Sequence, residues 1–131
     1  MPSDAWYAAK IVFALYEDCG PCTQLAVDMA ERGGVKPEVL RAVLAGDIAA
    51  MPADVALTFR FAEAVLARAP ETDELREAVL ASWGPRSLVS LAFAMTVAQL
   101  YPTVKFALGH GQACRRVTVG GQAQPVQRRA A

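Results

Sequence analysis

The chain has 131 residues, which is enough for one domain with a single hydrophobic core. Its 13 basic and 13 acidic side chains cancel, so no net charge attracts the chain to nucleic acid or to an anionic membrane. No secretory signal is evident, and no uninterrupted apolar run reaches the ~18 residues of a membrane span, so we expect a cytoplasmic protein. Three cysteines in a reducing compartment favour catalytic, metal-binding or packing roles over a structural disulfide framework.

Helical periodicity runs through almost the whole chain, and no segment alternates convincingly as a β-strand. Prolines at first helical positions and glycines just past the last ones divide the first half of the chain. This division predicts four helices: residues 5–16, residues 21–32, residues 37–45 and a fourth that starts at Pro52. In the fourth helix, the residues that share one apolar face are Val55, Phe59, Ala62 and Leu66.

Two more helices are predicted in the second half. The fifth begins at Thr72, has acidic residues in its first turns where the helix dipole favours them, and ends at the Gly-Pro-Arg after Trp83. Residues 87–101 are apolar nearly all round, which predicts a central, buried helix that Pro102 bends or restarts.

From Gly120 onward the chain is mainly Gly, Gln, Pro and Arg, so we expect a disordered tail. The predicted fold class is all-α, a single-domain array of about six helices. Its domain covers residues 1–114, and a flexible basic tail covers residues 115–131.

The motif that points to chemistry is Cys19-Gly20-Pro21-Cys22, at the start of the second helix. Cysteines three residues apart on a helical turn come close enough for a disulfide, and a helix N-terminus stabilises a thiolate. Carboxylates act in the opposite direction: Glu17 and Asp18 raise the pKa of a nearby thiol unless one of them accepts its proton. The position of Cys19 favours it as the more exposed thiolate. The alternative is that both cysteines are small packing residues.

A zinc site is a further alternative. The single histidine and the third cysteine form an HxxxC pair, so a tetrahedral Cys3His set is conceivable from Cys19, Cys22, His110 and Cys114. The two halves are far apart in sequence, and their spacing matches no familiar zinc module. A redox dithiol, in contrast, needs neither a metal nor an organic cofactor.

The segment EDCGPCTQLAVDMAERGGVKPEVLRAVLAGD resembles the signature region of the carboxymuconolactone decarboxylase and alkylhydroperoxidase D-like superfamily. The later FRFAEAVL and KFALGHGQAC segments also fit, and the similarity extends from Ala5 to Cys114. The resemblance implies an all-α domain that assembles into homo-dimers, trimers or hexamers. Its peroxidase branch implies that Cys22 attacks a hydroperoxide, that Cys19 resolves the sulfenic acid as a disulfide, and that an external thiol reduces the pair. The decarboxylase branch lacks the dithiol and is less favoured.

The proton relay of that family is not matched in its usual form. Its histidine, one turn after the second cysteine, corresponds to Ala26, and its glutamate corresponds to the neighbourhood of Tyr7. We therefore take Glu17 as the candidate proton acceptor and His110 as a weaker one. Two main functions stay open: a CxxC redox protein with alkyl hydroperoxidase activity, using a small hydroperoxide and a thiol reductant, and a non-catalytic helical oligomerisation module. The structural zinc site is the third. Neither involves nucleic acid or a membrane.

Overall fold

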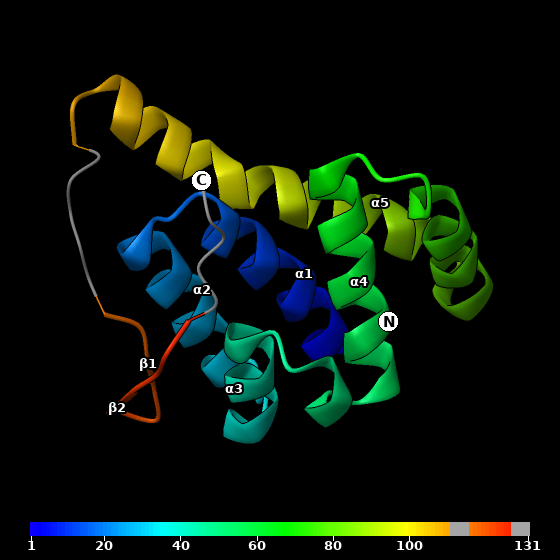
Figure 1. The fold of residues 1–131 in the computed structure, drawn as a ribbon, viewed down its shortest axis with the longest axis horizontal. Helices are drawn as coiled ribbons and strands as arrows, with labels where there is room; N and C mark the ends of the chain where they lie inside the picture. The colour runs from blue at the N-terminus through cyan, green and yellow to red at the C-terminus, as the bar shows by residue number, and fades with distance from the viewer. Residues whose placement is uncertain (111–115, 127–131) are drawn as a thin grey trace.

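The computed structural model describes residues 1–110 and 116–126, and helices dominate it (Figure 1). The helices are α1 (Ser3–Tyr16), α2 (Gly20–Arg32), α3 (Pro37–Ala45), α4 (Ala53–Ala67) and α5 (Thr72–Ala107), with a 3-10 turn, η1 (Ile48–Ala50), between α3 and α4. Two short strands, β1 (Thr118–Val119) and β2 (Gln122–Ala123), form an antiparallel hairpin. The prediction of an all-α fold is therefore confirmed at the level of fold class.

Helix α1 is the centre of the fold. It contacts α2, α3, α4 and α5, and Figure 1 shows it between α2 on one side and α4 on the other. Seven of its 14 residues are buried: Ala5, Ala8, Ala9, Ile11, Val12, Phe13 and Ala14. Because four of these seven are alanines, neighbouring helices can approach α1 closely from several sides.

The prediction that residues 87–101 form the central buried helix is wrong. Within α5 this segment buries one face, formed by Leu91, Ala94, Met95 and Ala98. Its other side is exposed to solvent, with Val89, Phe93, Val97, Leu100 and Tyr101 between 42% and 67% accessible. An apolar sequence all round a helix shows that every face is suited to burial, but not that every face has a partner within the chain.

The fifth and sixth predicted helices are joined into α5, and the predicted break lies inside it. Gly84 adopts φ 75° and ψ 176°, a backbone conformation that only glycine reaches without strain, so the chain changes direction there. Pro102 is buried and stays within the helix. The helix ends after Ala107, where Gly109 has φ 80° and the His110 N–H donates to the Lys105 carbonyl at 2.8 Å.

Residues 116–126 differ from the predicted disordered tail. Strand β1 lies against α2 and α3, and Val117 and Val119 are buried there. The side-chain amide of Gln24 in α2 pairs with the backbone of Thr118: its Oε1 accepts from the N–H at 2.6 Å, and its Nε2 donates to the carbonyl at 3.1 Å. Gly120 and Gly121 supply the two positive φ angles, 56° and 77°, that a tight two-residue hairpin turn needs. The rest of the predicted tail lies outside the described residues.

Candidate redox site

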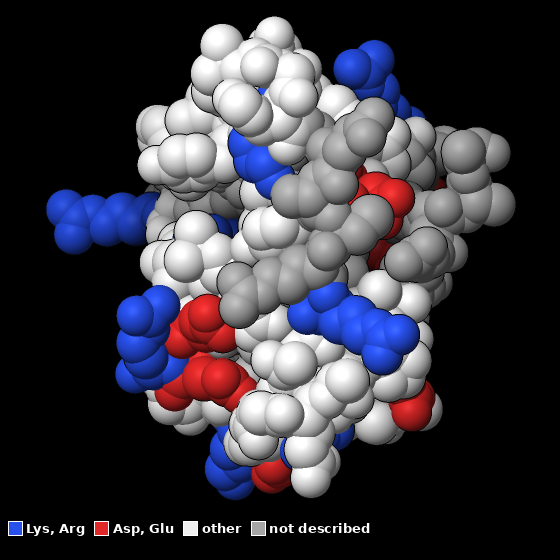
Figure 2. Space-filling view, turned by 90° about the vertical axis from the view of Figure 1, so that its left-hand side faces the viewer, with Lys and Arg blue, Asp and Glu red and all other residues white. Residues whose placement is uncertain are grey.

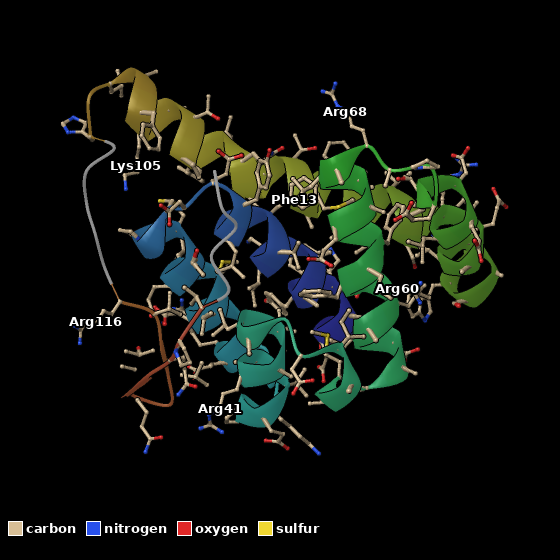
Figure 3. The ribbon with its side chains drawn as sticks, in the orientation of Figure 1. Phe13, Arg41, Arg60, Arg68, Lys105 and Arg116 are labelled. Atoms are coloured by element: carbon tan, nitrogen blue, oxygen red, sulfur yellow. A yellow bond between two sulfur atoms is a disulfide. The ribbon has the colours of Figure 1, made fainter. Side chains whose placement is uncertain are left out.

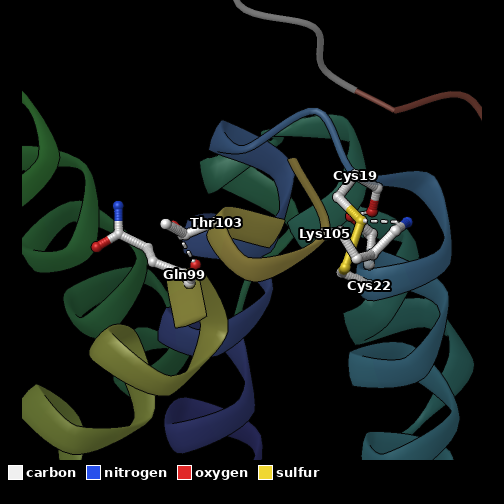
Figure 4. Close-up of a disulfide and its surroundings, with 6 residues drawn as sticks. Cys19, Cys22, Gln99, Thr103 and Lys105 are labelled. Atoms are coloured by element: carbon white, nitrogen blue, oxygen red, sulfur yellow. Dashed lines mark hydrogen bonds between the residues drawn. A yellow bond between two sulfur atoms is a disulfide. The ribbon is translucent and has the colours of Figure 1, made fainter. Parts of the chain in front are cut away.

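The two cysteines of the motif lie at the N-terminus of α2 and are joined by a disulfide (Figure 4). Cys19 is the residue just before the helix and Cys22 is in its first turn, so their Cα atoms are 5.2 Å apart, a separation typical of disulfides. The Cys19 carbonyl accepts hydrogen bonds from the Thr23 N–H at 2.9 Å and from the Thr23 hydroxyl at 3.0 Å. The prediction that this spacing brings the two sulfurs together is confirmed.

The start of α2 is also suited to negative charge. No side chain caps this helix, and its first turn contains no acidic residue. Pro21 stands at the beginning of the helix, where the missing N–H costs nothing. The remaining free N–H groups of the first turn, together with the helix dipole, therefore favour a thiolate at this position.

The two cysteines differ in their exposure to solvent. Cys19 is only 6% exposed, whereas Cys22 is partly exposed. The interpretation that favoured Cys19 as the more exposed thiolate is therefore wrong, because the chain turns at Asp18 (φ 46°) and enters α2 with Cys19 facing the interior. Cys22 is thus the more exposed residue of the pair.

A lysine from the far end of α5 lies beside the inner sulfur. The Nζ of Lys105 is 3.6 Å from the Sγ of Cys19 (Figure 4), and its side chain points from α5 toward the start of α2 (Figure 3). Sequence reasoning missed this residue because 86 positions separate the pair. One signal was available: Lys105 is the only Lys, Arg, Asp or Glu between Arg86 and Arg115.

The two candidate proton acceptors are placed differently from Lys105. The Oε1 of Glu17 accepts a hydrogen bond from the Nε2 of Gln99 at 2.8 Å, which connects the end of α1 to α5. His110 is exposed beyond the end of α5. Glu17 is thus hydrogen-bonded to Gln99, whereas the charged side chain beside the sulfur of Cys19 is that of Lys105.

The positions that correspond to the relay of the resembled family belong to a packing cluster. Ala26 is buried, and the Tyr7 ring packs edge-on against Trp6 and close to the backbone of Gly33. The Nζ of Lys10 lies 3.5 Å from the Sδ of Met29 and 5.5 Å from the centre of the Trp6 ring. Partial burial lowers the pKa of Lys10 below its ordinary value of 10.5.

The four residues considered for zinc do not form a described site. Cys114 lies outside the residues that the structure describes, and Cys19 and Cys22 are bonded to each other. Within residues 1–110 and 116–126, no group of three His, Cys, Asp or Glu side chains is arranged to hold a metal ion.

The surface around the candidate site has no dominant charge. Figure 2 shows the side of the molecule that carries the C-terminal end of α5, and basic and acidic side chains are interspersed there among uncharged ones. A continuous basic face of the kind that binds nucleic acid is not seen on this described surface.

Comparison of the chain with protein-family models, with curated proteins and with solved structures finds no match. The function therefore has to be argued from the residues of the site itself.

Proposed function

We propose that this chain is a thiol–disulfide redox protein in which Cys19 and Cys22 cycle between dithiol and disulfide. A small hydroperoxide is the oxidising substrate, an external thiol is the reductant, and the reducing cytoplasm is the compartment in which such a cycle operates. The proposal is carried by the disulfide at the start of α2, which joins a buried Cys19 to a partly exposed Cys22. The resemblance to the alkylhydroperoxidase D-like superfamily supports the same chemistry.

In the oxidative half of the cycle, the Cys22 thiolate attacks the terminal oxygen of the hydroperoxide. An S–O bond forms as the O–O bond breaks, and the leaving alkoxide takes a proton and departs as an alcohol. The Cys19 thiolate then attacks the Sγ of the Cys22 sulfenic acid. The S–S bond forms, the S–O bond breaks, and the leaving hydroxide takes a proton and becomes water.

In the reductive half, an external thiolate attacks the more accessible Sγ of Cys22. The S–S bond breaks, and its electron pair stays on Cys19, which leaves as a thiolate. A second external thiol then attacks the mixed disulfide and releases Cys22, so that the reductant ends as a disulfide. Every bond in the cycle is made between sulfur, oxygen and hydrogen, and no step requires a metal or an organic cofactor.

Peroxide consumption with dithiothreitol as reductant tests the proposal in the wild type, Cys19→Ser and Cys22→Ser, with Cys114→Ser as the control for the third cysteine. We expect turnover in the wild type and in the control. Cys22→Ser should lose the first oxidation step, and Cys19→Ser should stop at a sulfenic acid that dimedone traps. A wild type that forms the intramolecular disulfide but consumes no peroxide would limit the chain to thiol exchange. A wild type that does neither would refute the redox function.

A second candidate function, a helical assembly module, is favoured by the outer face of α5. We define this face as Val89, Phe93, Val97, Leu100, Val104 and Leu108, which lie within about a third of the helix circumference. Each is at least 42% exposed, and residues 87–104 contain no Lys, Arg, Asp or Glu. Their exposed area is on the order of 600 Å², close to the ~800 Å² that each partner contributes to a standard interface.

A second copy of this chain is the occupant that we propose for the outer face of α5. An uncharged apolar stripe is self-complementary across a twofold axis, so two copies can cover each other's stripes. Among the described residues, α5 is also the one helix long and apolar enough to cross a membrane, a test that core helices of globular proteins pass as well. A lipid surface is therefore the competing occupant.

Analytical ultracentrifugation of the wild type and Phe93→Glu separates these two occupants, with Arg60→Glu on an exposed face of α4 as the control. We expect the wild type and the control to form dimers or larger homo-oligomers and Phe93→Glu to sediment as a monomer. Flotation of the wild type with neutral lipid vesicles, without self-association in solution, would overturn the proposal in favour of a membrane surface.

A further inference from the structure

The proposed cycle requires Cys19 to be a thiolate twice, although the sulfur is buried. It is the nucleophile when the sulfenic acid is resolved, and it is the leaving group when the disulfide is reduced. Burial alone opposes a charged sulfur, and the histidine of the resembled relay is replaced by the buried Ala26. A group that stabilises negative charge at the inner sulfur is therefore needed.

The end of α5 places a cation at this sulfur. The Nζ of Lys105 lies 3.6 Å from the Sγ of Cys19, and its side chain is partly buried. Of the two carboxylates that precede Cys19, that of Glu17 accepts a hydrogen bond from Gln99, and Asp18 is exposed to solvent.

The backbone at Lys105 is fixed on both sides. The preceding turn contains the buried Pro102 and the Thr103 hydroxyl, which donates to the Gln99 carbonyl at 2.8 Å. The Lys105 carbonyl itself accepts the His110 N–H at 2.8 Å, which closes the helix. These contacts fix the helix around Lys105, and the hydrogen bond from Gln99 to Glu17 ties the same helix to the residues just before Cys19.

We propose that Lys105 is a catalytic residue of this redox site, whose ammonium holds the Cys19 Sγ as a thiolate whenever the disulfide is open. The inference rests on the proposed function and names the group that stabilises the Cys19 thiolate in a chain where Ala26 replaces the histidine of the resembled relay. Lys105 acts by its charge and keeps its proton throughout. The Cys19 thiol releases its proton to solvent, and the electron pair of the breaking S–S bond stays on Cys19 beside the ammonium.

The first test isolates Cys19 in a chain that cannot form the disulfide. In a Cys22→Ser, Cys114→Ser background, Cys19 is the only thiol, and its alkylation rate by iodoacetamide is followed against pH. Lys105→Gln is compared with Lys105→Arg, which keeps the charge, and with Lys36→Gln, which removes the charge of an exposed lysine before α3. We expect Lys105→Gln to raise the midpoint of the alkylation curve by about one pH unit, because a neighbouring lysine lowers the pKa of a thiol. Lys105→Arg should restore most of the shift, and Lys36→Gln should cause none.

The second test uses the intact cysteine pair and an equilibrium with glutathione. Lys105→Gln should shift the equilibrium toward the disulfide, because the reduced state loses its stabilised thiolate. It should also slow disulfide formation from the sulfenic acid about threefold at neutral pH. A one-unit rise in pKa reduces the thiolate tenfold, but the more basic thiolate is the better nucleophile and recovers part of the rate.

The two proposals fail in distinguishable ways. An unchanged alkylation midpoint in a folded Lys105→Gln variant would overturn the role of Lys105 and leave the dithiol cycle intact. Alkylation of Cys19 in the single-thiol background needs neither peroxide nor a disulfide. A shifted midpoint in a chain that never consumes peroxide would therefore support the Lys105–Cys19 pairing and refute the peroxidase cycle.

Discussion

Helix α1 and residues 87–107 of α5 are both apolar almost throughout, yet they occupy opposite environments. Half of α1 is buried, and four helices pack around it. The α5 segment buries one side and exposes large side chains such as Phe93, Leu100 and Tyr101 on the other. The difference lies in the size of the side chains: the alanines of α1 admit neighbours on several sides, whereas the bulky residues of α5 form a stripe that needs a partner from outside.

The same two helices meet at the redox site. The C-terminal end of α1 leads directly into the cysteine motif, and Glu17 there is hydrogen-bonded to Gln99 of α5. One turn and a half later α5 brings Lys105 to Cys19. The central helix therefore positions the cysteines, and the peripheral helix supplies the charged group beside them.

Truncation of one aliphatic side chain in each helix should have very different effects on the free energy of unfolding. Ile11 in α1 is fully buried, so Ile11→Ala should lower the free energy of unfolding by about 2–5 kcal/mol through lost burial and the remaining cavity. Leu100 on the outer face of α5 is 55% exposed, so Leu100→Ala should change the free energy of unfolding by less than about 0.5 kcal/mol. Urea unfolding at a concentration that keeps the chain monomeric measures both. Equal losses in the two variants would show that the outer face of α5 is covered within a single chain.

A polar side chain, that of Gln24, holds the C-terminal hairpin against α2. Gln24 is buried, and its amide satisfies both the N–H and the carbonyl of Thr118. Gln24→Ala leaves these backbone groups without partners and should cost about 1–3 kcal/mol. The loss should be local: amide protons of β1 should exchange faster, while those of α1 keep their protection. Leu25→Ala, at a neighbouring exposed position, is the control and should leave the hairpin protected.

The features that could be predicted from the sequence are those that depend on neighbouring residues along the chain. Proline and glycine positions locate both ends of α2 and α3 and the start of α4 to within a residue or two, because these residues act through local backbone geometry. The Cys19–Cys22 pair is equally local, since three-residue spacing on a helix brings the sulfurs together.

Contacts between distant segments were out of reach of the same reasoning. Gln24 meets Thr118 across 94 residues, and Lys105 meets Cys19 across 86. Neither pair has a periodic signature, because each depends on how whole helices are arranged. The burial of Cys19 and the exposure of the outer face of α5 depend on that arrangement too, which is why both were predicted wrongly.

The smallest expected effect is a pH-dependent change in the free energy of unfolding, caused by Lys10, the only lysine of α1. Partial burial lowers the pKa of Lys10 in the folded chain, whereas the unfolded chain keeps the ordinary value of 10.5. Between the folded pKa and 10.5 the unfolded chain binds more protons, so raising the pH through this window favours the fold, and at lower pH the cost of the buried charge is fully present. The free energy of unfolding of the wild type, minus that of Lys10→Met, should therefore rise by a few tenths of a kcal/mol as the pH is raised toward 10.5, since solvent screens the partly exposed ammonium. Urea midpoints of the two chains across this range measure the difference. A flat or falling difference would mean that the Lys10 ammonium stays as hydrated in the folded chain as that of an exposed lysine. The packing of Trp6 and Met29 around it would then not remove its charge from solvent.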